Sequence, residues 1–189
     1  MSDIESPSPG GVDNGIDYEL DDELDLDTPE RLKAVGDPLR GLICDLVLER
    51  AMSVTDLAQV SGRPRGSVAH HVGVLVDAGL LKVVRTRQVR AVVERFYGRT
   101  ARTFKFGRAH DGLPFAAAAI AEFDDTHPLA AHASATLRRA RVPLDRVDEY
   151  VRRLEALALE FSREPRSGDA EFGLYFVVFP TNRLRGAEQ

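Results

Sequence analysis

The sequence predicts a mainly α-helical fold with a small β-hairpin, an α+β arrangement built around a winged helix-turn-helix. Two short helical stretches flank a turn at Gly62-Arg63-Pro64, and the second stretch ends at Gly79. The apolar period then changes from helical to alternating over Leu80–Tyr97. Two helices around a tight turn, followed by a basic hairpin, are typical of this fold.

The N-terminal segment, residues 1–27, has a different composition from the rest of the chain. It is rich in Asp, Glu, Ser, Pro and Gly and poor in branched apolar residues. Such a segment buries too little surface to offset its ordering entropy, so we expect a disordered acidic tail. Order should begin at Thr28, because it can cap a helix that starts with Pro29. Residues 28–108 then form the predicted winged helix-turn-helix domain.

Within this domain the helices follow from caps and apolar spacing. Asp37-Pro38 begins a helix whose apolar residues recur every three or four positions, and Ser53 begins the next. A third helix runs from about Arg65 to Ala78 and is the predicted recognition helix. Its core-facing residues are Val68, Val72 and Leu75. The hairpin pairs Leu80–Arg87 with Ala91–Tyr97 across a tip at Gln88-Val89-Arg90.

The C-terminal third, residues 109–189, is expected to form a separate helical lobe for dimerisation or sensing, with a terminal strand. Leu113–Phe123 predicts one helix, and Pro143 begins a long second one. The apolar residues of the long helix alternate steps of three and four, which is typical of a helix that pairs with a partner. The residues expected to make the homodimer are Val147, Val151, Leu154 and Phe161. Phe172–Phe179, a continuous apolar run ended by Pro180, predicts one buried strand.

The net charge of −5 conceals an uneven distribution. Residues 1–30 carry 11 acidic and no basic side chains, whereas residues 31–108 carry nine more basic than acidic ones. Attraction to phosphate depends on local charge, so the basic centre is compatible with nucleic-acid binding. We also hypothesise that the acidic tail competes with DNA for the basic face. Deleting residues 1–27 should then strengthen non-specific DNA binding.

The predicted partner is double-stranded DNA, contacted by polar side chains of the recognition helix and by the hairpin. Arginine can donate to guanine or phosphate, and serine to phosphate or a base edge. Long side chains near a wing tip can reach the minor groove. The candidate DNA-binding residues are Arg63, Arg65, Ser67, His70, Lys82, Arg85, Arg87 and Arg90. His71 leans toward the core, where a half-buried, satisfied histidine is expected instead of a base contact.

These motifs resemble those of the ArsR family of bacterial repressors. The resemblance rests on Asp37-Pro38-Leu39-Arg40, on Ser53–Ala58 and on Ser67–Leu81, and it fades after about Phe104. It implies a homodimeric winged-helix repressor released from its operator by an inducer, here an unknown small molecule. Carried over by position, Arg65, Ser67 and His70 fall where the family contacts DNA. The terminal helix and strand resemble an added dimerisation or sensing lobe of some members.

Two departures from the family pattern matter. Pro64 stands where the family often has a serine or threonine cap, and Gly66 replaces a polar residue, so base preference is expected to differ. The metal-sensing members carry a Cys-x-Cys-like pair in the preceding helix. Residues 54–60 hold no cysteine, so thiolate metal sensing is not expected at that site.

Other classes of site are weakly supported. Asp124, Asp125, His127 and His132 have loose spacing, so a polar loop is favoured over a metal site, and no cofactor is expected. Cys44 is interpreted as a small buried hydrophobe in place of a redox sensor. The sequence lacks a phosphate-binding loop, a nucleophile elbow or paired carboxylates, which argues against an enzyme.

The expected location is the cytoplasm, because the sequence contains no run of 18 apolar residues and no secretory signal pattern. Two functions remain open. The first is sequence-specific DNA binding by a dimer. The alternative is a winged helix that acts as a protein-interaction adaptor and does not read DNA.

Overall fold

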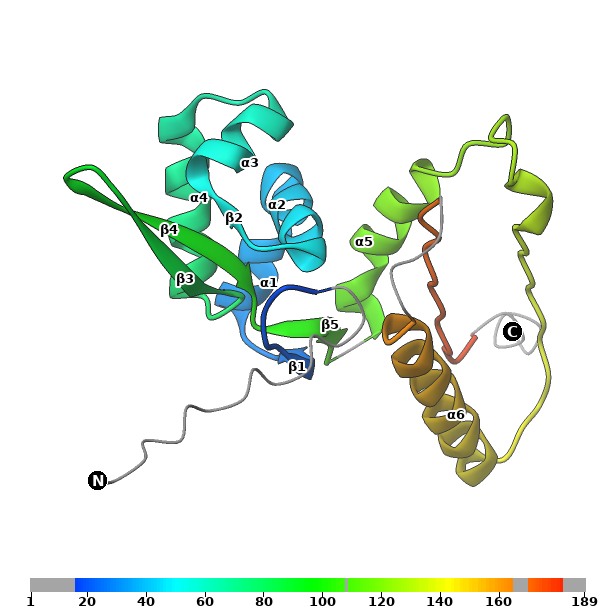
Figure 1. The fold of residues 1–189 in the computed structure, drawn as a ribbon. Helices are drawn as coiled ribbons and strands as arrows, with labels where there is room; N and C mark the ends of the chain where they lie inside the picture. Colours follow the sequence, from blue (N-terminus) through cyan, green and yellow to red (C-terminus); the bar gives the residue numbers. More distant parts are fainter. Residues whose placement is uncertain (1–15, 108, 165–169, 182–189) are drawn as a thin grey trace, which may run out of the picture.

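The computed structural model describes residues 16–107, 109–164 and 170–181. Figure 1 shows a compact group of helices and a long hairpin at one side, and the C-terminal helices at the other. A pair of short strands lies between the two groups. The predicted winged helix-turn-helix is confirmed, and the N-terminal and C-terminal segments differ from prediction.

Four helices build the first group: α1 (Pro29–Val35), α2 (Pro38–Glu49), α3 (Val54–Ser61) and α4 (Arg65–Asp77). The predicted caps are confirmed. The Thr28 hydroxyl accepts from the Arg31 backbone N–H at 3.2 Å, and Pro29 occupies the first turn. Ser53 and Asp56 form a reciprocal capping box at the start of α3. Gly62 ends α3 in the left-handed region at φ 64°, where a side chain would be strained.

The Asp37-Pro38-Leu39-Arg40 motif connects the ends of two helices. The Asp37 carboxylate caps α2 by accepting from the Arg40 backbone N–H at 3.1 Å. The Arg40 guanidinium donates to the Lys33 carbonyl at 2.8 Å and also to the Ala34 carbonyl. These carbonyls lie at the end of α1 and lack helical partners. The motif therefore fixes the angle between α1 and α2.

The core lies where these helices meet. The fully buried members that α2, α3, α4, the turn after α4 and the start of the next strand contribute are Ile43, Val47, Leu57, Val68, Val72, Leu75, Leu80 and Leu81. Each helix contributes one apolar stripe and leaves the opposite face in solvent. The core thereby determines which face of each helix remains available for a ligand.

A three-stranded antiparallel sheet completes the winged helix. It contains β2 (Met52–Ser53), β3 (Leu81–Val89) and β4 (Val92–Arg99) in the order β2-β4-β3. The hairpin is longer than predicted, because Val89 pairs with Val92 and the turn consists of Arg90 and Ala91. Arg90 adopts φ 54°, an unusual conformation for a residue with a side chain. We refer to the β3–β4 hairpin as the wing.

The prediction that residues 1–27 are disordered is wrong for residues 16–27, and residues 1–15 lie outside the described part. Strand β1 (Asp21–Leu26) pairs in parallel with β5 (Ala101–Phe106). Ile16 and Leu26 are only 2% and 1% exposed. The composition of this segment is dominated by carboxylates and therefore hid its few buried apolar residues. Composition also could not show that β5 provides backbone hydrogen bonds that an isolated segment lacks.

The C-terminal helices are α5 (Ala109–Ala121) and α6 (Leu144–Ser162), with a short 3-10 helix, η1 (Ala130–His132), between them. The helices predicted at Leu113–Phe123 and after Pro143 are therefore confirmed. The strand predicted at Phe172–Phe179 is wrong, because residues 171–181 have no regular secondary structure. Most of its large apolar residues are exposed, among them Phe172 at 47% and Phe179 at 53%. An apolar run forms a strand only where another strand accepts its backbone hydrogen bonds.

Candidate nucleic-acid interface

Helix α4 has one buried and one exposed face. Val68, Val72 and Leu75 are at most 2% exposed and pack into the core. The outer face carries Arg65, Ser67, Ala69, His70 and Gly73, and its first four members are exposed. The sequence prediction that Arg65, Ser67 and His70 lie away from the core stripe agrees with this geometry. An α-helix with a small, polar outer face fits the major groove of DNA.

The start of α4 is also open to solvent. Pro64 precedes the helix and provides no side-chain cap. A Cβ at Gly66 would meet no atom within 4 Å. The first backbone N–H groups of a helix have no intrahelical acceptor and attract anions, including phosphate. Arg63 and Arg65 flank this end, and neither has a carboxylate partner among the described residues.

His71 of α4 is half-buried, as predicted, and faces the start of α2. Its Nδ1 is 3.5 Å from an Arg40 nitrogen and 3.6 Å from an Asp37 carboxylate oxygen. Burial tends to raise the pKa of Asp37, but the Arg40 N–H and the nearby Arg40 and His71 charges outweigh it and lower the pKa. His71 thus belongs to the polar contact between helices, whereas the adjacent His70 remains exposed.

Two of the wing arginines that are candidate DNA contacts already bind carboxylates in the structure. Arg87 binds Glu94 across the hairpin at 2.7 Å, and Arg85 binds Asp17 of the N-terminal segment at 2.6 Å. Both guanidinium groups lie over the Phe96 ring, at 5.3 and 4.7 Å from its centroid. The structure therefore brings Arg85 and Arg87 together on one face of the wing, and each has a carboxylate partner.

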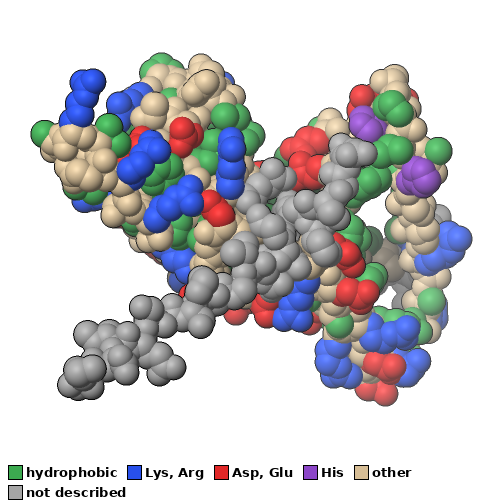
Figure 2. All heavy atoms as spheres, in the orientation of Figure 1, with side chains coloured by type: hydrophobic (Ala, Val, Ile, Leu, Met, Phe, Trp, Pro, Cys, Tyr) green, Lys and Arg blue, Asp and Glu red, His purple; other side chains and the backbone are tan. Residues whose placement is uncertain are grey.

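The tip and the base of the wing present the remaining candidates. Arg90 lies in the turn, with no carboxylate partner in the described segments, and Lys82 is half-buried at the base. Val89 and Val92 flank Arg90 and are 44% and 66% exposed. Figure 2 shows Lys and Arg side chains over the group that contains the wing, with hydrophobic side chains beside the tip. The tip is thus cationic and apolar together.

The sequence analysis missed Asp17 and Tyr18, which contact the winged helix directly. Besides Arg85, Asp17 accepts from the Ala51 backbone N–H at 2.7 Å. The Tyr18 hydroxyl donates to the Val47 carbonyl at 2.5 Å and accepts from the Arg99 backbone N–H at 3.0 Å. The only signal in the sequence was that Ile16 and Tyr18, both apolar, flank a single carboxylate within an acidic stretch.

The residues predicted for dimerisation lie along α6, whose apolar row is incompletely covered in one chain. Val147, Val151 and Leu154 are half-buried and Phe161 is 41% exposed; α6 has no fully buried residue. The inner side of α6 contacts β5 and β1 through charged groups. Lys105 of β5 lies 3.7 Å from Glu155, and Arg163 binds Asp22.

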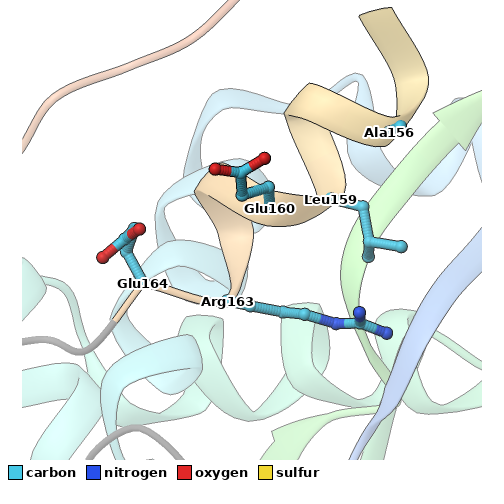
Figure 3. Close-up of a pocket in the computed structure, with 5 residues that line it drawn as sticks. All are labelled: Ala156, Leu159, Glu160, Arg163 and Glu164. Atoms are coloured by element: carbon cyan, nitrogen blue, oxygen red, sulfur yellow. The ribbon is translucent and has the colours of Figure 1, made fainter. Parts of the chain in front are cut away.

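A shallow pocket near the C-terminal end of α6 offers little to a ligand. Its lining residues are Ala156, Leu159, Glu160, Arg163 and Glu164. Figure 3 shows that the Arg163 side chain points away from the two glutamates, toward the strand where Asp22 lies. The only cation of the lining is therefore already engaged.

The alternative sites have structural explanations. Cys44 is buried, as expected, and burial raises the pKa of its thiol to about 12. The Asp124 carboxylate accepts from the Thr126 backbone N–H at 2.9 Å, and His127 Nδ1 accepts from the Leu129 backbone N–H at 3.1 Å. Within the part of the chain that the structure describes, His, Cys, Asp and Glu form no group of three or more suited to a metal ion.

Comparison with known proteins bears on the segment that forms this interface. A family model described as a helix-turn-helix domain matches residues 35–84, which cover α2, α3, α4 and the start of the wing. This chain contains a helix-turn-helix domain. Such domains place their second helix in the DNA major groove. Residues 35–84 are therefore a helix-turn-helix domain of the kind found in DNA-binding transcription regulators.

Several solved structures share partial similarity with the chain. HlyU from Vibrio cholerae N16961 is 24% identical over 38% of this chain and 73% of its own, with a TM-score of 0.32. The transcriptional repressor BigR from Xylella fastidiosa is 22% identical over 49% and 83%, with a TM-score of 0.33. The homodimeric winged helix-turn-helix domain of Mb0332 from Mycobacterium bovis is 19% identical over 55% and 82%, with a TM-score of 0.32. A comparison with curated proteins gave no match.

The helices of the described residues do not have the character of membrane spans. None of them is both long enough and apolar enough to cross a membrane. The longest helix, α6, carries charged residues throughout its length.

Proposed function

We propose that the protein is a homodimeric repressor of the ArsR-like type that binds a specific double-stranded DNA operator. The observation that supports this most is the outer face of α4. Its basic and polar side chains surround an open helix start, while its inner face is fully buried in the core. A recognition helix requires this division, because base contacts demand a fixed and exposed polar face.

The proposed DNA contacts fall into two groups. Arg63, Arg65, Ser67 and His70 would lie in or beside the major groove, and Arg90 would reach the adjacent minor groove or its phosphates. Lys82, Arg85 and Arg87 would contact phosphate. The last two must first exchange their carboxylate partners, because Asp17 and Glu94 already bind them.

A homodimer is supported by the incompletely covered apolar row on α6, in which Val147, Val151 and Leu154 are half-buried and Phe161 is exposed. Two copies bound to two half-sites would also match the usual symmetry of helix-turn-helix operators. Release by a small-molecule inducer is proposed from the family resemblance. Because its target is genomic DNA in a bacterial setting, we place the protein in the cytoplasm.

The experiment that tests this proposal is selection of genomic DNA fragments by the purified protein, followed by binding measurements on the recovered sequence. We expect a shared sequence with two related half-sites. Arg65→Ala should weaken binding to that site by about 1–3 kcal/mol and relax its base preference. Recovery of fragments without a common sequence, with Arg65→Ala unchanged, would favour the alternative of a protein-interaction adaptor.

A further inference from the structure

Residues 16–26 form a continuous segment that touches both the wing and α6; we call it the acidic strap. Figure 1 shows its last part, β1, beside β5, between the winged helix and α6. The strap begins at Ile16, and the next residue, Asp17, binds Arg85 of the wing. Its strand end lies beside the helix proposed to make the dimer. The strap therefore connects the wing with α6, two regions that are far apart in the sequence.

Shape complementarity fixes the strap against the winged helix. The Tyr18 ring lies over Gly98 of β4, and a Cβ at Gly98 would come within 2.5 Å of that ring. The Tyr18 hydroxyl bonds to α2 and to β4, and Ile16 is 2% exposed. Tyr18 and Ile16 therefore fix the position of Asp17, which lies between them.

Asp17 is bound to a wing arginine that is a candidate phosphate contact. One of its carboxylate oxygens accepts from the Ala51 N–H at 2.7 Å, and the other binds Arg85 at 2.6 Å. The Arg85 side chain remains 49% exposed, so solvent and DNA can reach it. A phosphate oxygen and a carboxylate oxygen are alternative acceptors for the same guanidinium group. DNA must therefore displace Asp17 to use Arg85.

The other end of the strap binds α6. Arg163 donates to both carboxylate oxygens of Asp22, one of them at 3.2 Å. The hydrogen bond from Arg163 is the largest cause of a lowered pKa at Asp22, and the Arg163 and Arg102 charges add to it. Lys105 of β5 bridges Glu23 of the strap and Glu155 of α6, at 3.5 and 3.7 Å. A displacement of α6 would therefore pull on β1.

We propose that the acidic strap couples α6 to the DNA affinity of the wing. While α6 binds Asp22, the strap stays in place and Asp17 occupies Arg85, so DNA binding is weakened. When α6 moves away from Asp22, the strap loosens and Arg85 becomes available to phosphate. The coupling rests on the DNA binding proposed above, and it assigns a regulatory role to a segment outside the matched helix-turn-helix domain.

The first test replaces Asp17, using the full chain and a fluorescein-labelled duplex of mixed sequence and about 30 base pairs, long enough for two half-sites. Asp17→Asn keeps the acceptor for Ala51 N–H but removes the charge facing Arg85. We expect binding to tighten by about two- to fivefold, as for loss of one exposed ion pair. Glu19→Gln removes an equal charge from an exposed neighbour and should change binding less. Equal effects of the two variants would overturn the role of Asp17.

The second test changes Arg163, at the other end of the strap. It predicts a change in DNA affinity opposite to the one expected from charge alone. Arg163→Gln removes a positive charge, which by simple electrostatics should weaken DNA binding. If Arg163→Gln releases the strap, DNA binding should instead become tighter, by at most the factor measured for Asp17→Asn. The matched control is Arg153→Gln on the same helix. In an Asp17→Asn background the tightening by Arg163→Gln should be lost, since coupled sites are not additive. Weaker binding, or an unchanged effect in that background, would overturn the coupling.

A measurement without DNA separates this inference from the proposed function. Hydrogen exchange of residues 16–20 should be faster in Arg163→Gln than in Arg153→Gln, because the strap is less restrained. If the wild-type chain binds no duplex but exchange responds in this way, the proposed function fails and the mechanical link survives. If DNA binds normally and exchange is the same in both variants, the proposed function survives and the coupling is wrong.

Discussion

Helices α4 and α6 both carry a row of apolar residues, but only α4 buries that row within one chain. Val68 and Leu75 of α4 have no exposed surface, whereas Phe161 in the row of α6 is 41% exposed. This difference in burial separates the roles of the two helices. Burial in the core determines which face of α4 is offered to DNA, and the incompletely covered row of α6 leaves room for another molecule.

The strongest test of this comparison is to truncate one apolar residue of each helix, Leu75 of α4 and Leu157 of α6, which is 50% exposed. Leu75→Ala should lower the free energy of unfolding by about 2–5 kcal/mol, because it leaves a cavity among fully buried neighbours. Leu157→Ala in α6 should cost about 0.5 kcal/mol or less in dilute protein, since half of that side chain is already in solvent. Urea denaturation followed by circular dichroism measures both, and similar costs would contradict the comparison.

Assembly is the next test. Leu154→Glu places a charge within the apolar row of α6 and should convert the proposed dimer to monomer, as measured by light scattering. Secondary structure should be unchanged, because Leu154 is only half-buried in the single chain. Arg153→Glu adds a negative charge outside the row and should leave the dimer intact. A dimer that persists in Leu154→Glu would place the interface elsewhere.

Substitutions in the wing should have smaller effects, which appear in the salt dependence of DNA affinity. Arg90→Ala should reduce the slope of log affinity against log salt by about 0.9, the loss of one phosphate contact. Arg87→Ala should reduce it by less, because Glu94 already neutralises part of that charge. Titration of a labelled duplex at several salt concentrations compares the two variants. Equal slopes would mean that DNA displaces Glu94 completely.

The smallest effect expected is on the pH dependence of stability. The pKa of Asp22 is lowered chiefly by its hydrogen bond from Arg163, so the unfolded chain binds the proton more tightly than the folded one. The stability from this pair is present above the ordinary pKa of 3.8 and is lost as the pH falls through the lower folded value. Asp22→Asn should therefore flatten the fall in stability in that acidic range, as followed by urea midpoints. A curve identical to the wild type would show that the pair adds nothing measurable.

Local rules predicted the winged helix well because its signals are local. Ser53 and Asp56 form the expected capping box, and Gly62 supplies the left-handed turn before α4. The apolar spacing of α4 also identified which of its polar residues face outward. In each case the deciding interactions lie within a few residues of one another, so the sequence contains them directly.

The remaining features depend on contacts between distant residues. Strand β1 forms because β5 offers a free edge, and Asp17 meets Arg85 only after the wing has folded. Composition assigned the first to disorder and gave no sign of the second. The opposite error occurred at Phe172–Phe179, where an apolar run predicted a strand that finds no partner in the described residues. In all three cases the outcome depends on whether residues distant in the sequence pair with one another.

Gly98 has a consequence for comparing related sequences. Because any side chain at this position would collide with Tyr18, the two residues constrain each other across the length of the domain. A relative that keeps both a glycine here and an aromatic residue in its N-terminal acidic segment should share the strap. One that replaces the glycine should have lost it. Regulators of this kind could thus be sorted into strapped and unstrapped groups by the residues at these two positions alone.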